Sequence, residues 1–559
     1  MFNVLIGGAA GDGIETMAGI LEKILLRSGF YLFSMRDFMS RVRGGHNFAL
    51  IRFGNQPVSA HRDTLDGLVV FNKESYFLHK DCLSKNAFVL CDKSLDIAGR
   101  NFIKIDGKKL AKEAGNPKSI STVYIGALLK LFGISDKAAA SVLQEKLPPK
   151  ILDANIAAAK KGYAAADRRF SAKAGTTKNT MLLTGSDAMA MGALAGNIRF
   201  YSAYPMSPST TLLEFFSARS GAFRIGVEQA EDEIAAVNMA LGASYTGARS
   251  MVGTSGGGFA LMVEALGFAG IAEIPIVIAD IQRPGPSTGL PTRTEQSDLS
   301  FVISASQGEF PRIVIAVKDH ADAFYQTARA FYLAEKYQVP VILLSDQYLA
   351  DSAVTIPLLD TKKASRYGAP AARKPTATAM QDYLRYKLTK NGISPLAAPG
   401  KSVSAVRADS DEHDERGVIT ESAEVRIAMT DKRNRKTAGI RTELQEPDFF
   451  GDQDAEVLLV GFGSTAGAIK EAVEIRNKQG KKKIGALCFS DVYPLPAEKL
   501  LEHSSKVRQM VNVEQNSTGQ LAKLIRQETL LPCTGSILKY DGRQISPDEI
   551  LDGLKQLKI

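Results

Sequence analysis

The sequence contains little cysteine, and no cysteine pair stands at metal-binding spacing. Its 559 residues include four cysteines, none of which forms Cys-x-x-Cys: Cys82, Cys91, Cys488 and Cys533. Four scattered cysteines exclude a disulfide framework and leave the chain without a plausible iron–sulfur ligand set of its own. The lone His413 stands in an acidic run, which is more typical of a surface residue than of a metal ligand.

Long apolar runs, a signal peptide and a charged tail are also missing. No run reaches transmembrane length, and the N-terminal segment lacks the charged start and cleavage site of a signal peptide. The 69 Lys+Arg and 60 Asp+Glu residues give a net charge of +9, spread through the chain. This mild basic balance suits anionic ligands or an acidic partner and is no nucleic-acid signature. We therefore expect a cytoplasmic protein that binds neither nucleic acid nor membrane.

The length predicts about three or four domains. Strand, glycine turn and helix follow one another repeatedly, which indicates an α/β fold with mainly parallel sheets. We place the domains at residues 1–175, 176–360 and 451–559. The poorly patterned residues 361–450 are expected to form an extended crossover or linker, since a structureless loop of this length is uncommon inside a compact domain.

The stretch from 227 to 259 has the most distinctive pattern in the chain. Four acidic residues crowd the start of a helix of small side chains: Glu228, Glu231, Asp232 and Glu233. A charged N-cap before a tight turn is the simplest interpretation. Alternatively, a buried carboxylate at the head of this helix could exchange a proton with a ligand nitrogen. The turn at 253–258 is almost free of side chains, so its backbone amides could approach a cofactor.

A second distinctive stretch, residues 282–298, follows an uninterrupted apolar strand at 274–279. Loops at the carboxyl ends of such strands are where open α/β sheets bind ligands. The loop contains Arg283 and Arg293, and an arginine presents a planar fork suited to a carboxylate. A surface salt bridge is the alternative for either arginine.

Together these stretches resemble the pyrimidine-binding domain of the 2-oxoacid:ferredoxin oxidoreductases, which are thiamine-diphosphate enzymes. In thiamine enzymes, a glutamate that binds N1′ of the aminopyrimidine is separated by eight residues from a helix glycine. Glu233 and Gly242 have the same separation. The loop matches the family segment Gln-Arg-x-Gly-Pro-Ser-Thr-Gly-Leu-Pro-Thr-x-Thr-Glu-Gln nearly residue for residue. The resemblance implies that Glu233 is catalytic and binds the cofactor. It also implies that Arg283 binds the C1 carboxylate of the substrate, with Arg293 as the second choice.

The resemblance adds further residues to the expected site. The family segment Tyr-Pro-x-Thr-Pro corresponds to residues 204–208, so the hydroxyl group of Ser207 is expected to contact cofactor or substrate. Other cofactor contacts are expected from Pro205, Thr254, Ser255 and Gly256.

The flanking regions resemble other parts of the same family. Up to about Gly162 the chain resembles the gamma subunit, with Gly-Gly-x-x-Gly-x-Gly-Ile at 7–14 and Arg-Gly-Gly-His at 43–46. Arg43 belongs either to a solvated hairpin or to a loop shaped for anions, and we expect it to contact substrate. From Ala455 the chain resembles the C-terminal domain of transketolase-type enzymes. The resemblance thus implies three α/β domains: a gamma-type domain, a thiamine-diphosphate pyrimidine-binding domain and a transketolase C-terminal-like domain.

The function implied by the resemblance is conversion of a 2-oxoacid and coenzyme A to acyl-CoA, carbon dioxide and reduced ferredoxin. Fusion of gamma ahead of alpha favours 2-oxoglutarate, while pyruvate, branched-chain and aryl 2-oxoacids stay open. Thiamine diphosphate is expected to be shared with a beta subunit. That subunit would carry Mg²⁺ and a [4Fe–4S] cluster, this chain would hold no metal, and the assembly would be an (alpha-beta)2 heterotetramer.

Three positions depart from the family pattern. Ser207 replaces a threonine, Gly257 stands where the family has a proline, and Gln307 stands where it has a histidine. These departures leave open a catalytically idle paralogue that acts as a binding or scaffold subunit.

Overall fold

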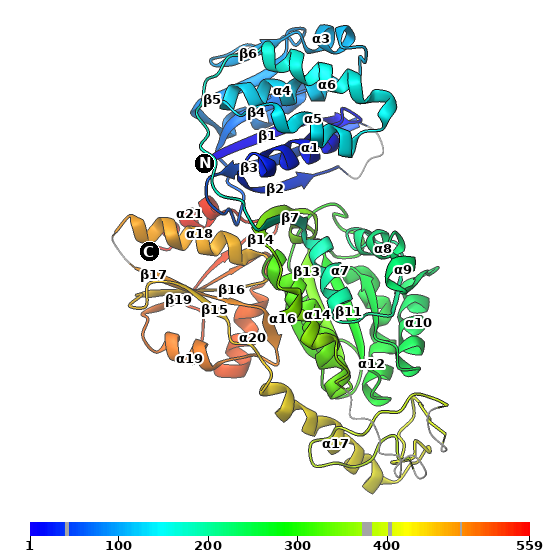
Figure 1. Cartoon of the computed structure of the whole chain (residues 1–559). Helices are drawn as coiled ribbons and strands as arrows, with labels where there is room; N and C mark the ends of the chain where they lie inside the picture. Colours follow the sequence, from blue (N-terminus) through cyan, green and yellow to red (C-terminus); the bar gives the residue numbers. More distant parts are fainter. Residues whose placement is uncertain (40–43, 372–382, 401–404, 481–482) are drawn as a thin grey trace. The chain divides into compact units, whose positions relative to one another are not determined.

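The computed structural model describes residues 1–39, 44–371, 383–400, 405–480 and 483–559 (Figure 1). These residues form two compact units. The first comprises residues 1–184, 351–358 and 546–548, and the second comprises residues 185–350, 359–545 and 549–559. Arg43, which the sequence predicts as a substrate contact, lies outside the described residues.

An eight-stranded mixed sheet organises the first unit, in the order β6-β5-β4-β1-β3-β2-β14-β7. Strands β6, β5, β4 and β1 are parallel, and the remaining strands extend the sheet by antiparallel pairing. The strands are β1 (Phe2–Ala10), β2 (Tyr31–Asp37), β3 (Gly44–Gly54), β4 (Leu65–Val70), β5 (Leu83–Asp92), β6 (Phe102–Ile105), β7 (Thr180–Thr184) and β14 (Ala353–Pro357).

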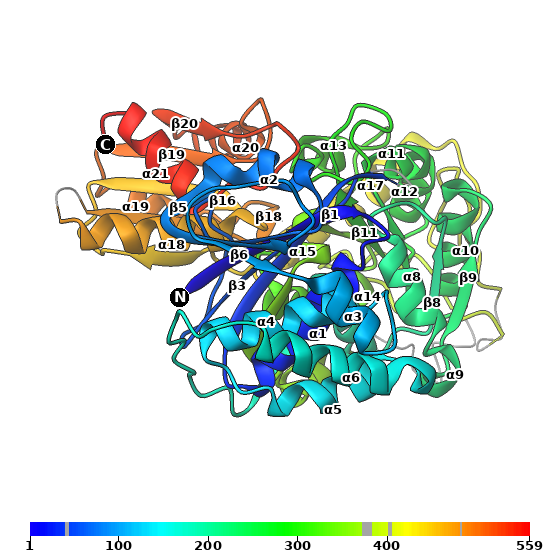
Figure 2. The same ribbon diagram turned by 90° about the horizontal axis from the view of Figure 1, so that it is seen from above.

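Helices cover both faces of this sheet. They are α1 (Ile14–Arg27), α2 (Lys73–His79), α3 (Gly107–Glu113), α4 (Ile120–Phe132), α5 (Lys137–Lys146) and α6 (Pro149–Ala164). Figure 2 shows α2 on one side of the sheet and α1, α4 and α6 on the other. Because both faces are covered, β1 is buried along most of its length, as expected for a strand inside an α/β unit.

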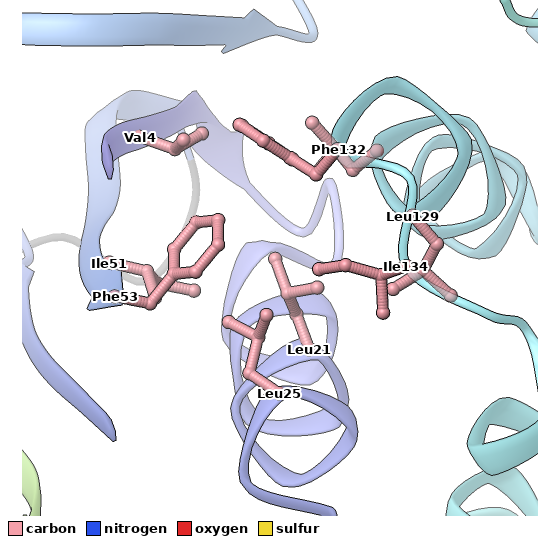
Figure 3. Close-up of a pocket in the computed structure, with 9 residues that line it drawn as sticks. Val4, Leu21, Leu25, Ile51, Phe53, Leu129, Phe132 and Ile134 are labelled. Carbon is pink, nitrogen blue, oxygen red and sulfur yellow. The ribbon is translucent and has the colours of Figure 1, made fainter. Parts of the chain in front are cut away.

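A small cavity remains in the core of the first unit, between α1, α4 and the strands β1 and β3 (Figure 3). Its volume is about 10 Å³, and it is lined by Val4, Leu21, Leu25, Ile51, Phe53, Leu128, Leu129, Phe132 and Ile134. A space of this size holds at most one water, and apolar walls offer that water no hydrogen bond. The cavity is therefore a packing gap and not a ligand site.

The second unit contains two sheets. The larger has the order β18-β12-β13-β11-β10-β8-β9, and all its pairs are parallel except β12 with β18. Its strands are β8 (Phe200–Ala203), β9 (Gly226–Gln229), β10 (Ser250–Thr254), β11 (Ile276–Gln282), β12 (Ile313–Ala316), β13 (Pro340–Asp346) and β18 (Asp491–Tyr493). The helices of this region are α7 (Gly185–Ala195), α8 (Thr210–Ser217), α9 (Ser220–Phe223), α10 (Glu233–Tyr245), α11 (Gly256–Phe259), α12 (Val263–Ile271), α13 (Leu299–Ser304), α14 (His320–Tyr337), α15 (Gln347–Asp351) and α16 (Thr361–Ser365).

The smaller sheet has the order β15-β17-β16-β19-β20, with an antiparallel edge strand β15 and parallel pairs elsewhere. Its strands are β15 (Asp448–Gly451), β16 (Val457–Phe462), β17 (Ile484–Phe489), β19 (Gln509–Glu514) and β20 (Gly535–Leu538). The helices that follow them are α18 (Thr465–Lys478), α19 (Glu498–Ser504), α20 (Gln520–Thr529) and α21 (Pro547–Gln556). Because β18 lies between β17 and β19 in the chain yet pairs with β12, it joins the two sheets.

The region predicted to be an irregular crossover contains a regular element, the 19-residue helix α17 (Ala423–Arg441; Figure 1). Its buried residues are Met429, Lys432, Arg433, Lys436 and Ile440. Most of these side chains are cationic, so the apolar spacing that predicts a helix is absent from the sequence.

A buried cluster of charges fixes α17 to the rest of the second unit. The two carboxylate oxygens of Glu273 lie 2.5 Å from Lys432 Nζ and 2.5 Å from Lys436 Nζ, and all three side chains are at most 1% exposed. Burial alone would raise the pKa of Glu273, but the charges of Lys436, Lys432 and Arg385 hold it well below its usual value. Burial also lowers the pKa of Lys436 to about 7, against the opposing charge of Glu273. The cluster joins α17 to the end of α12.

Candidate active site

Glu233 begins α10 and is 3% exposed. The preceding residue, Asp232, caps the helix, because its Oδ1 accepts a hydrogen bond from Ala235 N at 2.7 Å. Capping by Asp232 leaves the carboxyl group of Glu233 free to turn inward. Its Oε1 is buried and has no hydrogen-bond partner among the described residues. A buried carboxyl oxygen in that state is suited to receive a ligand group.

The glycine turn at 256–258 lies directly against this carboxyl group. A Cβ atom on Gly258 would overlap Thr254 Oγ1 and would come within 2.5 Å of Glu233 Oε1. A Cβ atom on Gly256 would lie 2.7 Å from Cγ of Asp298. Both distances are shorter than real Cβ contacts, so a side chain at either position would displace the neighbouring carboxyl group. Two carboxyl groups, from Glu233 and Asp298, thus flank one short turn.

Arg283 stands at the end of β11 and reaches the same turn region. Its Nη1 donates a hydrogen bond to the backbone carbonyl of Ser207 at 2.6 Å. Burial lowers the pKa of Arg283, and the negative charges of Asp298 and Glu233 oppose that shift. The structure therefore brings together Glu233, Arg283 and Ser207, three residues that the sequence predicts as one site. Ser207 contributes its carbonyl to this contact, and its own side chain is exposed.

Two carboxyl groups beside the site were given no role from the sequence. Asp280, inside β11, is 0% exposed, and neither of its carboxylate oxygens has a hydrogen-bond partner in the described ranges. Burial and then the charge of Asp298 raise the pKa of Asp280 well above its usual value. Burial and then the charge of Glu295 raise the pKa of Asp298 to about 6, while Arg283 opposes the shift. Only burial in the folded chain, complete for Asp280 and partial for Asp298, sets these residues apart from ordinary surface aspartates.

The remaining predicted residues lie around this centre at different depths. Thr254 and Ser255 are 0% exposed, and Ser255 Oγ has no hydrogen-bond partner within the part of the chain that the structure describes. Pro205 is half-buried in the loop after β8. Arg293 lies farther along the loop of residues 282–298, and its Cβ would be 3.1 Å from a Cβ atom on Gly542. The structure thus places Arg293 beside the segment that follows β20.

Neither a metal cluster nor a membrane-spanning helix is found among the described residues. No group of three or more His, Cys, Asp or Glu side chains in the described ranges is arranged to hold a metal ion. None of the described helices combines the length and the hydrophobicity needed to cross a bilayer.

Comparisons with known proteins cover almost the whole chain. Three family models match: pyruvate ferredoxin/flavodoxin oxidoreductase at residues 3–165, its thiamine-diphosphate-binding domain at 191–432, and pyruvate:ferredoxin oxidoreductase core domain II at 455–550. The 2-oxoacid:ferredoxin oxidoreductase subunit alpha of a Sulfolobus species is 34% identical, over 98% of this chain and 96% of the relative. The chain belongs to the family of 2-oxoacid:ferredoxin oxidoreductase alpha subunits.

Other members of this oxidoreductase family agree with that assignment. The 2-oxoglutarate oxidoreductase subunit KorA of Mycobacterium tuberculosis is 32% identical, over 76% of this chain and 66% of the relative. A solved structure of 2-oxoglutarate:ferredoxin oxidoreductase from Magnetococcus marinus, with 2-oxoglutarate, coenzyme A and succinyl-CoA bound, is 31% identical. It superimposes with a TM-score of 0.93 over 99% of both chains. These matches confirm the predicted resemblance, the oxidoreductase class and the α/β fold with mainly parallel sheets.

Proposed function

We propose that this chain is the alpha subunit of a cytoplasmic, thiamine-diphosphate-dependent 2-oxoacid:ferredoxin oxidoreductase. The complete enzyme decarboxylates a 2-oxoacid oxidatively, transfers the acyl group to coenzyme A and passes two electrons to ferredoxin. One observation carries the proposal: the buried Oε1 of Glu233 lies against Gly258 with no hydrogen-bond partner among the described residues, and Arg283 lies within electrostatic reach. 2-Oxoglutarate is the favoured substrate, because the Magnetococcus marinus enzyme was solved with it.

The residues of the site fit the aminopyrimidine ring of thiamine diphosphate. A buried carboxyl oxygen without a partner can form a charge-assisted hydrogen bond with the N1′ nitrogen of that ring. When bound, the cofactor supplies the carbanion chemistry. The part of this chain is to hold a proton between Glu233 and N1′. By their match to the family segments, Pro205, Thr254, Ser255 and Gly256 would line the ring.

Arg283 is proposed to bind the C1 carboxylate of the 2-oxoacid. A guanidinium group forms two parallel hydrogen bonds with a carboxylate, and partial burial strengthens them. The hydrogen bond from Nη1 to the carbonyl of Ser207 fixes the orientation of the guanidinium group. The other N–H groups of Arg283 are left to bind substrate. Ser207, Arg293 and Arg43 are proposed as further substrate contacts, by their match to the family segments.

The other half of the site is proposed to lie on a beta subunit. That subunit carries Mg²⁺ with the diphosphate group and a [4Fe–4S] cluster, and two alpha–beta pairs form the working enzyme. The scattering of the four cysteines of this chain supports that division, since a cluster needs cysteine thiolates grouped around it. Ferredoxin and coenzyme A are proposed as the partners that receive the electrons and the acyl group.

The test is anaerobic co-purification of this chain with its beta subunit, followed by coenzyme-A-dependent reduction of a viologen dye. 2-Oxoglutarate, pyruvate, a branched-chain and an aryl 2-oxoacid are supplied in turn. We expect the highest kcat/KM with 2-oxoglutarate. A preference for another 2-oxoacid would change the proposed substrate and leave the proposed enzyme class standing. No turnover from a complex that retains thiamine diphosphate and an intact cluster supports the idle paralogue, to which Ser207, Gly257 and Gln307 point.

A further inference from the structure

The strand order of the smaller sheet reverses at one point. In its order β15-β17-β16-β19-β20, the chain passes from β16 to one side and later returns to the other side as β19. Open α/β sheets bind ligands where the order reverses, outside the carboxyl ends of the strands. In this chain that place lies just after Phe462 of β16 and Glu514 of β19.

A side chain from the loop at residues 282–298 occupies this place. Gln296 Nε2 donates to the carbonyl of Phe462 at 2.8 Å, and Gln296 N donates to the carbonyl of Gln515 at 2.8 Å. The carbonyl of Gln296 accepts from Asn516 Nδ2 at 3.1 Å. Protein therefore occupies this place, and these hydrogen bonds anchor the loop that carries Arg283.

Gln520, the first residue of α20, holds the next part of the same loop. Its Nε2 donates to the carbonyl of Ser297 at 2.7 Å, and its Oε1 accepts from Ser300 N at 2.8 Å. The side-chain amide of Gln520 thus donates one hydrogen bond before Asp298 in the chain and accepts another after it. The partners are 220 and 223 positions apart in the chain, so this contact exists only in the folded protein.

Asp298 lies between Ser297 and Ser300, and it connects this clamp, the pair of hydrogen bonds made by Gln520, with the candidate active site. Its backbone N donates to Gln282 Oε1 at 3.0 Å, and its carboxyl group packs against the α-carbon of Gly256. The charged groups that act on this carboxyl are Glu295, on the same loop, and Arg283, at the end of β11. The charge of Asp298 in turn raises the pKa of Asp280, inside β11. A shift of residues 297–300 would therefore move a charge beside Arg283.

We propose that Gln520 is a positioning residue for recognition of the 2-oxoacid: by holding Ser297 and Ser300 it fixes the Asp298 carboxyl between the Gly256 turn and Arg283. The proposal rests on the proposed function and gives helix α20, beside the smaller sheet, a part in the site. Gln520 itself touches neither substrate nor cofactor. If the clamp opens, Asp298 gains solvent and is ionised at lower pH, which weakens the attraction of Arg283 for a substrate carboxylate.

The test compares Gln520→Ala with Gln527→Ala, which removes an exposed glutamine from the same helix. Both variants are purified as the alpha–beta complex and assayed with the 2-oxoacid that the unmodified enzyme uses best. At a pH of about 5, where Asp298 of the unmodified enzyme is neutral, we expect Gln520→Ala to raise KM up to about tenfold, with kcat changed less than about twofold. Above a pH of about 7, where Asp298 is ionised in both proteins, the two KM values should agree. The pH at which KM changes should also move to a lower value. Gln520→Glu keeps the acceptor but loses the donor, and should give an intermediate KM.

A second readout does not depend on turnover. Hydrogen–deuterium exchange of the full chain should be faster in residues 283–300 of Gln520→Ala than in Gln527→Ala, with equal exchange in β11 and β13. Equal exchange in 283–300, or an unchanged KM and pH dependence, would overturn the positioning role. A complex with no 2-oxoacid turnover before mutation would reject the proposed function instead, and the exchange comparison would then decide by itself whether Gln520 holds the loop.

Discussion

The carboxyl group of Glu233 packs against the α-carbon of Gly258, so that a Cβ atom there would come within 2.5 Å of Glu233 Oε1. Gly257, one position earlier, has room: the nearest atom to its Cβ would be the carbonyl oxygen of Ser287, at 3.6 Å. Of these two adjacent glycines, Gly257 has space for a methyl group and Gly258 does not. This contrast allows the contact to be tested by two matched substitutions.

Gly258→Ala is expected to weaken thiamine diphosphate binding about ten- to a hundredfold, because the added methyl group displaces both Thr254 and Glu233. Gly257→Ala should have a much smaller effect. Titration calorimetry of the alpha–beta complex with thiamine diphosphate and Mg²⁺ measures both. Equal affinities for the two variants would show that Glu233 does not hold the cofactor beside this turn.

The pH dependence of substrate binding should report Asp298. Its pKa of about 6 means that it is neutral below this pH and ionised above it. Ionised Asp298 offsets the charge of Arg283, so KM for the 2-oxoacid should rise by about an order of magnitude as the pH increases from about 5 to about 7. Asp298→Asn, which stays neutral, should keep the low KM throughout. A step near pH 6 that persists in Asp298→Asn would assign it to another group.

The charge cluster beneath α17 should be important for stability. Glu273→Gln removes the carboxylate that pairs with both Lys432 and Lys436, and leaves two cations buried together. Breaking a buried ion pair in this way costs about 3–5 kcal/mol of unfolding free energy. Urea denaturation of this variant against Glu264→Gln, an exposed glutamate on α12, measures the difference. A loss below about 1 kcal/mol, within the range of an exposed pair, would mean that α17 is held by other contacts.

Local motifs explain why Glu233, Arg283 and the glycine turn lie near one another. Glu233, the glycine turn and Arg283 each follow a buried strand or open a helix, and the larger sheet brings the ends of such strands to one edge. The pattern of residues therefore accounts for their positions in the fold, while their roles rest on the family resemblance and stay predictions. The contact of Arg283 with the backbone carbonyl of Ser207 was not expected in that form, since the resemblance pointed to the hydroxyl group.

Long-range packing explains what the sequence could not predict. Asp280 and Asp298 differ from surface aspartates only in burial, which depends on the whole sheet. Gln520 contacts Ser297 across 223 positions, and no spacing rule reaches that far. Helix α17 was missed for another reason: it buries Lys432 and Lys436, whereas amphipathic patterns assume that a buried helix face is apolar.

The most direct test of the proposed function is the activity of Glu233→Gln in the alpha–beta complex, measured as coenzyme-A-dependent viologen reduction. Glutamine keeps the shape of the side chain but cannot exchange a proton, so we expect kcat to fall by about 10²–10⁴ with the thermal unfolding midpoint unchanged. Glu231→Gln, two positions earlier and exposed, should retain the activity of the unmodified chain. Full activity of Glu233→Gln would contradict the assignment of this carboxylate as the proton-holding group of the site.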